Sequence, residues 1–181
     1  MSQLSSIISA DSFKSACRTV RADLKNLGFW SKKLANVTVR QTYFGFAYGW
    51  QYYRGCGDIV IPKISMIRMY DGCCRGDSMP LRDVLRHEYG HAVADNHRSL
   101  VKSSKFRDVF GAAHDNLECF HYSDKEHVSY YASDNVGEDF AETFMYFIKY
   151  KGKLPKDFDT PAIRKKWNFV KYLGNCFKDI E

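Results

Sequence analysis

Apolar residues recur every three to four positions in four stretches of the chain, which is the spacing of an amphipathic helix. The four stretches are residues 11–27, 78–92, 136–148 and 160–177. Gly28 is placed to end the first helix, whereas Ser78 and Pro80 are residue types that begin the second. We therefore expect four helices that each bury one face.

Between the first two helices the pattern changes to that of strands. Residues 37–53 are rich in β-branched and aromatic side chains with glycines at 45 and 49, which predicts two or more strands whose aromatic residues form sheet core. Residues 57–69 predict another strand. Pro62 cannot donate a ladder hydrogen bond, so we expect this strand at a sheet edge or with a bulge. The pattern as a whole predicts a compact α+β domain with a small mixed sheet.

Length and composition favour one globular domain. The chain has 181 residues, of which 45% are hydrophobic, and no repeat or low-complexity tract marks a second domain. No apolar run is long enough to cross a membrane, and the first ten residues lack a secretory signal, so we expect a cytoplasmic monomer unless it is exported by a non-classical route. Within the domain we distinguish residues 1–55, 56–150 and 151–181.

Charge and cysteine usage exclude some functional classes. The net charge of +6 comes from Lys and Arg spread along the chain without a long basic run, so we expect a solvated surface and no nucleic-acid partner. The six cysteines include no C-x-x-C pair, which argues against zinc ribbons and redox motifs. We expect reduced and mostly buried thiols.

The chemistry is concentrated in His87-Glu88-Tyr89-Gly90-His91, an H-E-x-x-H pattern on the second predicted helix. Histidines at i and i+4 lie on one helix face and can bind one zinc ion, with Glu88 beside them. A catalytic zinc site has three protein ligands and an open position, so a third ligand is required.

Two positions could supply that ligand. His97 reproduces the spacing H-E-x-x-H-x-x-G-x-x-H, but alanine stands at position 94 where that pattern needs glycine. Glu138 and Glu142 lie one turn apart on the third helix, so one could bind zinc while the other supports a ligating histidine. We expect His114, His121 and His127 to be loop or surface residues. Cys73 or Cys74 could also reach the metal as an inhibitory thiolate, although plain loop thiols are the commoner case.

These residues resemble a known family. His87–Val93, Ser104–Phe110, Tyr131 and Glu138–Phe144 are together similar to the catalytic domain of gluzincin metallopeptidases of the anthrax lethal factor type, which include the Pro-Pro endopeptidases. The likeness covers about residues 55–150. It implies a zincin-like fold with an edge strand next to the H-E-x-x-H helix and a Glu-bearing helix after it.

The resemblance also implies roles for individual residues. One Zn²⁺ per chain would be bound by His87, His91 and Glu138, with Glu142 supporting a histidine. Glu88 would act as general base and Tyr131 would stabilise the oxyanion, although the neighbouring Tyr130 could face the metal instead. The implied function is a zinc endopeptidase, with a protein or peptide substrate bound along the strand near residues 58–67. The alternative is a non-catalytic binding or toxin-related module that retains the fold.

Overall fold

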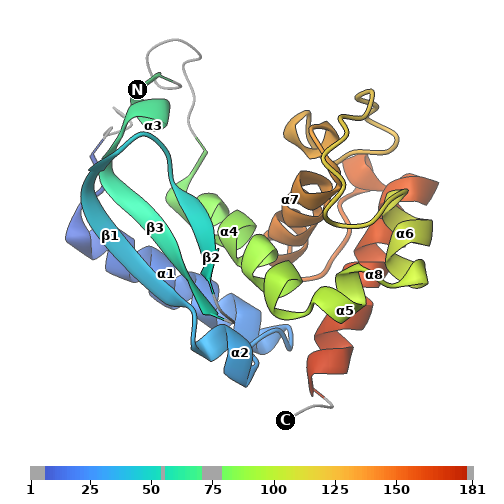
Figure 1. The fold of residues 1–181 in the computed structure, drawn as a ribbon, viewed down its shortest axis with the longest axis horizontal. Helices are drawn as coiled ribbons and strands as arrows, with labels where there is room; N and C mark the ends of the chain where they lie inside the picture. The colour runs from blue at the N-terminus through green and yellow to red at the C-terminus, as the bar shows by residue number, and fades with distance from the viewer. Residues whose placement is uncertain (1–6, 54–55, 71–78, 179–181) are drawn as a thin grey trace.

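The structure is a computed structural model, and it describes residues 7–53, 56–70 and 79–178. Eight helices, three strands and two short 3₁₀ turns are assigned within these ranges (Figure 1). In chain order they are α1 (Ala10–Asn26), α2 (Lys32–Ala35), β1 (Thr38–Gly45), β2 (Gly49–Tyr53), β3 (Cys56–Ser65), α3 (Met66–Tyr70), α4 (Leu81–Asn96), α5 (Arg98–Val101), α6 (Ser104–Phe110), η2 (Tyr131–Ser133), α7 (Val136–Lys149), η3 (Lys156–Phe158) and α8 (Pro161–Lys178).

The four predicted helices are confirmed as α1, α4, α7 and α8. The Ser9 side chain caps α1 by accepting the Ser12 N–H, and Gly28 follows the helix at φ 82°, a conformation that favours glycine. The proposed cap of α4, Ser78, lies outside the described residues. Pro80 stands directly before the first helical residue of α4, where a missing N–H costs nothing.

The sheet is small and mixed, with strand order β1-β3-β2. β1 runs parallel to β3, and β2 runs antiparallel to it, so the expected α+β class is confirmed. The strand containing Pro62 is predicted at an edge or with a bulge, but β3 is the central strand and its register with β1 and β2 is constant over the paired residues. The edge strand beside α4 is β2 instead (Figure 1).

The length of β2 explains how β3 accommodates a proline. The pairing of β2 with β3 ends at Gly49 opposite Val60, so Pro62 lies beyond the last residue pair on that side. The segment from Ile7 covers the next stretch, where Ile8 N–H donates to the Lys63 carbonyl at 2.9 Å. Pro62 therefore falls between two pairing partners, where the missing N–H breaks no ladder bond to β2.

The elements form two groups on either side of α4 (Figure 1). The sheet, α1 and α2 lie on one side, and α5 to α8 lie on the other. One continuous apolar core joins them, and α7 is buried over almost its whole length. α8 packs against α7. No helix in the described ranges is long and apolar enough to span a membrane.

Charged side chains also lie inside the molecule. Arg86 on α4, only 8% exposed, donates to Asp23 of α1 at 2.8 Å and to Asp83 at 2.6 Å. Lys149 of α7 donates to the second oxygen of Asp83 at 2.7 Å. This chain of ion pairs fixes α1, α4 and α7 to one another.

Two expectations about burial are wrong. The aromatic residues of the first two strands do not all form sheet core, because Tyr43 is 74% exposed and Phe46 76% exposed at one end of the sheet. The described thiols of Cys17, Cys119 and Cys176 are unpaired, as expected, but none is fully buried. Cys73 and Cys74 lie outside the described residues.

Candidate metal centre

Two histidines of α4 project from one face of the helix. His87 and Glu88 are buried at 6% and 5% exposure, and His91 is partly buried one turn later. The Nε2 atoms of His87 and His91 lie 3.1 Å apart. The i, i+4 spacing therefore brings two imidazole nitrogens to one point, as the sequence predicts.

Glu138 of α7 reaches the same point from the opposite side. Asn135 caps α7 by accepting the Glu138 N–H through its side-chain oxygen, which places Glu138 in the first turn. Its Oε2 lies 3.1 Å from His87 Nε2 and 3.4 Å from His91 Nε2. The ligand atoms of these three residues lie within 4.8 Å of one another, which makes them a candidate metal-binding group.

Glu142 lies behind His87, one turn further along α7. Its Oε1 is 2.8 Å from His87 Nδ1, and its Oε2 accepts the Ser129 hydroxyl at 2.7 Å. A carboxylate at Nδ1 holds the proton on that nitrogen, which leaves the lone pair of Nε2 free for a metal. The sequence left open which glutamate lies beside the two histidine Nε2 atoms. In the structure it is Glu138, whereas Glu142 contacts His87 Nδ1.

Gly90 allows the two helices to approach closely enough for this arrangement. A Cβ atom at position 90 would lie 3.0 Å from Ala141 Cα and 3.3 Å from the Ala141 carbonyl oxygen. Only glycine avoids this crowding of the α7 backbone. The middle of the H-E-x-x-H pattern is therefore the contact point between the helices that carry the ligand atoms.

The three residues fit a tetrahedral metal ion. Ligand atoms bound to zinc at about 2.0–2.1 Å in a tetrahedron are separated by about 3.3 Å, close to the three distances found here. Among the described residues, Glu138 Oε2 is buried and has no neighbour to pair with except the two imidazole nitrogens, so a cation between the three atoms would satisfy it. Two imidazoles and one carboxylate are also a donor set that zinc prefers.

The electrostatics of the group are tightly coupled. Burial lowers the pKa of His87, but Glu138 and Glu142 outweigh burial and raise it to about 10. Burial raises the pKa of Glu138, but the rings of His87 and His91 hold it well below its ordinary value. Without a metal, the group therefore favours a positive imidazolium beside a carboxylate. A divalent cation would replace that positive charge.

Tyr131, rather than Tyr130, faces the candidate centre. The Tyr131 ring centre lies 5.7 Å from that of His87, whereas Tyr130 is 73% exposed and packs against Tyr122 at 5.4 Å. Burial and the nearby Glu138 raise the pKa of the Tyr131 phenol above its ordinary value. The phenol therefore keeps its proton and can donate a hydrogen bond.

The remaining histidines lie elsewhere. His97 follows the end of α4 and stacks on Phe177 of α8 at 4.1 Å, and burial lowers its pKa to about 4. His121 is exposed, as expected for a loop residue. His114 and His127 also lie in loops, as expected, but neither is exposed. His114 packs on Phe106 and Phe140, and His127 is only 5% exposed.

Sequence reasoning missed the partner of Glu88. The backbone N–H of Trp50, on the edge strand β2, donates to Glu88 Oε2 at 2.7 Å. The Trp50 indole N–H donates to Asp95 Oδ2 at 2.9 Å, so this residue is bound to α4 at two points. Periodicity along one segment carries no signal for a contact between a strand and a helix 38 residues later in the chain.

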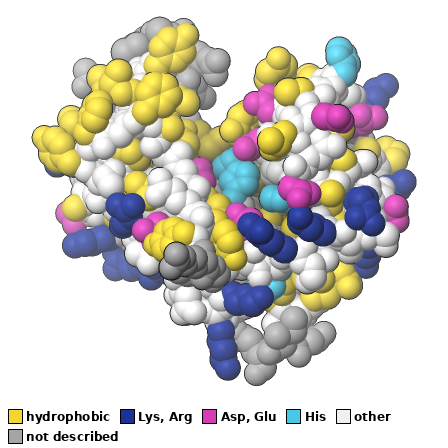
Figure 2. Space-filling view, viewed as in Figure 1, with side chains coloured by type: hydrophobic (Ala, Val, Ile, Leu, Met, Phe, Trp, Pro, Cys, Tyr) yellow, Lys and Arg dark blue, Asp and Glu magenta, His cyan; other side chains and the backbone are white. Residues whose placement is uncertain are grey.

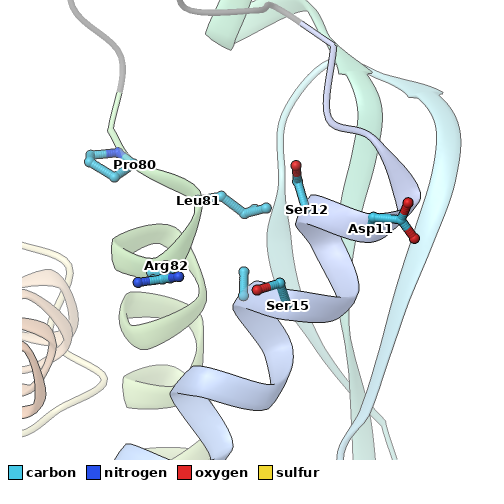
Figure 3. Close-up of a pocket in the computed structure, with 7 residues that line it drawn as sticks. Asp11, Ser12, Ser15, Pro80, Leu81 and Arg82 are labelled. Atoms are coloured by element: carbon cyan, nitrogen blue, oxygen red, sulfur yellow. The ribbon is translucent and has the colours of Figure 1, made fainter.

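The surface around the group is hollowed. In Figure 2, histidine and acidic side chains gather in a depression between the sheet side of the molecule and the α5–α8 side. A separate hollow of about 530 Å³ lies between the starts of α1 and α4, lined in part by Asp11, Ser15 and Arg82 (Figure 3). No residue of the candidate metal centre lines that second hollow, so the two are distinct.

Fold and site together define an α+β protein with a His-His-Glu group at metal-binding distance between two packed helices. No protein-family model, curated protein or solved structure matches the chain.

Proposed function

We propose that the protein is a zinc-dependent endopeptidase with His87, His91 and Glu138 as metal ligands. The observation that carries this proposal is the convergence of three ligand atoms, from helices far apart in sequence, at separations of 3.1–3.4 Å. Two further groups support catalysis over a purely structural ion. Glu88 lies beside the ligands, and Tyr131 leans over His87.

The residues around the metal have separate tasks. Bound zinc would supply an acidified water and polarise the scissile carbonyl. Glu88 would take a proton from the water as the new C–O bond forms, and pass it to the amine nitrogen as the C–N bond breaks. Burial raises the pKa of Glu88, which makes it a better base. Tyr131 would donate its phenol proton in a hydrogen bond to the developing oxyanion.

The strand expected to bind the substrate, near residues 58–67, is the central strand β3, so we place the substrate at the edge of β2 instead. In the part of the chain that the structure describes, β2 pairs with β3 on one side and with no strand on the other, where α4 lies next to it and Glu88 accepts the Trp50 N–H. An extended peptide can add to such an edge through main-chain hydrogen bonds. A peptide bound there would pass Glu88, since Trp50 of β2 contacts this carboxylate directly.

Metal content tests the ligand set. Purified wild type, Glu138→Gln and His97→Gln would be compared by elemental analysis. We expect one zinc per chain in the wild type and in His97→Gln, and loss of zinc in Glu138→Gln. Loss of zinc in His97→Gln alone would overturn the ligand set. Gently purified wild type without zinc would favour the non-catalytic module.

Peptide cleavage tests the activity. Wild type and Glu88→Gln would be incubated with a peptide library, and their zinc content measured in the same samples. We expect cleavage by the wild type only, with equal zinc in both proteins. Full zinc occupancy without cleavage in the wild type would contradict the enzyme and leave a binding module that holds a structural ion.

A further inference from the structure

Trp50 fastens the edge strand β2 to the helix that carries H-E-x-x-H. Its backbone N–H donates to Glu88 at 2.7 Å and its indole N–H donates to Asp95 at 2.9 Å. Glu88 and Asp95 are seven residues apart, which places them on the same face of α4 about 10 Å from each other. One residue of the strand thus holds the helix at two points.

The first contact uses a backbone group on the open side of the sheet. Trp50 stands opposite Ile59 in the pairing of β2 with β3, and its N–H turns away from β3 to meet Glu88. A carboxylate as buried as Glu88 needs donors, and here a main-chain amide fixes one of its two oxygens. Fixing one oxygen restricts the rotation of the carboxylate and so sets the direction of the other oxygen.

The second contact fixes the side chain of Trp50. A Cβ atom at Gly57 of β3 would collide with the indole ring, so the ring lies across a position that only glycine can occupy. Asp95 accepts the indole N–H on one oxygen and the Arg98 guanidinium on the other at 3.2 Å. The guanidinium in turn lies 4.9 Å over the Tyr52 ring. The indole ring is therefore held by packing over Gly57 and by the hydrogen bond of its N–H to Asp95, which Arg98 holds in place.

We propose that Trp50 is a positioning residue, in which the indole bond to Asp95 holds the β2 amide on Glu88 and so sets the orientation of that carboxylate. The proposal has two halves. The geometric half is that the indole bond to Asp95 holds the Trp50 amide on Glu88, and it concerns the protein without metal. The catalytic half rests on the proposed function, because it treats Glu88 as the general base. The two halves have separate measurements.

The geometric half is tested by NMR on metal-free protein labelled with ¹⁵N-tryptophan. The chain has three tryptophans, and the signals of Trp50 are assigned by their loss in Trp50→Phe. In Asp95→Ala we expect faster solvent exchange of the Trp50 indole N–H and also a shifted, less protected Trp50 backbone amide. Asp95→Asn keeps an oxygen acceptor and should restore both signals. An unchanged backbone amide in Asp95→Ala would overturn the proposal, whether or not the protein has activity.

The catalytic half is tested by kinetics on zinc-loaded protein. Trp50→Phe keeps an aromatic ring but removes the indole donor, so we expect kcat to fall about 10-fold to 100-fold with KM and zinc content unchanged. Asp95→Ala should have the same effect, Asp95→Asn should recover most of the rate, and the double variant should be no slower than either single one. Additive losses, or a change in KM alone, would contradict positioning.

Trp167→Phe is the matched control. The Trp167 indole donates to the Gly152 carbonyl at 3.0 Å, a bond of the same kind on α8. Its loss should lower stability without changing kcat. An equal fall of kcat in Trp167→Phe and Trp50→Phe would show a general effect of destabilisation and overturn the catalytic half. If the wild type cleaves no peptide, the proposed function fails, and the NMR result still decides whether Trp50 orients Glu88.

Discussion

Replacing Glu142 with glutamine should weaken zinc binding about 10-fold. Glu142 is 2% exposed, and its two oxygens contact His87 Nδ1 and the Ser129 hydroxyl. Glutamine has the same shape and can keep both contacts, with its oxygen toward His87 and its amide toward a hydroxyl that can also accept. The substitution therefore removes the charge and leaves the hydrogen bonds.

The magnitude follows from the loss of that charge. A hydrogen bond to a charged group contributes about 1.5–3 kcal/mol, and a neutral one about 1 kcal/mol. The difference is on the order of 0.5–2 kcal/mol, and about 1.4 kcal/mol corresponds to a factor of ten in affinity. This agrees with the loss of about 10–100-fold that is typical for removing the carboxylate behind a ligating histidine.

The assay is a competition titration of metal-free protein with zinc against a chromophoric chelator at neutral pH. Glu118→Gln is the matched control, since it removes one negative charge from an exposed position. We expect the control to bind zinc like the wild type. Wild-type affinity in Glu142→Gln would refute the supporting role of Glu142, and a loss as complete as that in Glu138→Gln would make Glu142 a ligand.

Three further perturbations follow from the geometry. Tyr131→Phe should lower kcat about 100-fold with unchanged zinc content, because it removes one oxyanion donor. Gly90→Ala should lower the free energy of unfolding by about 1–3 kcal/mol and reduce Tm, because the added methyl group meets Ala141. The folded-state pKa of His97 is about 4, below its ordinary value, so the folded protein binds fewer protons than the unfolded chain between about pH 4 and pH 6.5. Stability should therefore fall as pH falls through this range, and His97→Phe, which can still stack on Phe177, should flatten the plot of Tm against pH.

Each of these variants has a control in the same chain. Tyr130→Phe should leave kcat unchanged, because Tyr130 packs on Tyr122 and away from His87. Gly49→Ala should cost less stability than Gly90→Ala, because a Cβ at position 49 meets nothing within 4 Å. Replacing His121 with Phe, which changes an exposed loop residue, should leave Tm unchanged. A result in which any control matches its test variant would remove the stated reason for the effect.

The helices could be predicted from the sequence because each repeats its apolar positions locally. α4 and α7 also carry their candidate ligands at i, i+4 spacings, so His87, His91 and the pair Glu138 and Glu142 could be found without coordinates. The spacing alone did not decide which glutamate meets the histidines. That outcome depends on the angle at which α7 crosses α4, and so on the contact at Gly90.

The sheet order could not be predicted for a different reason. Pro62 predicts an edge strand or a bulge, yet β2 ends before it reaches Pro62, and the length of β2 is not encoded at Pro62. The ion pair of Arg86 with Asp23 joins residues 63 positions apart. The net charge of the sequence gives no sign that either side chain is buried, although each is almost fully buried in the structure. Contacts of this kind depend on tertiary packing, which a periodic pattern does not encode.

The close packing at Gly90 has a consequence for the order of events in folding. His87 and Glu138 are about 50 residues apart, and they meet only after α4 and α7 have formed and docked without a side chain between them. An ion held by this group would therefore be captured late, by a chain already close to its native form. Such an ion would slow unfolding, because α4 and α7 could not separate until it is released. Zinc would then stabilise the folded protein kinetically, and the lifetime of the folded state would depend on the zinc concentration.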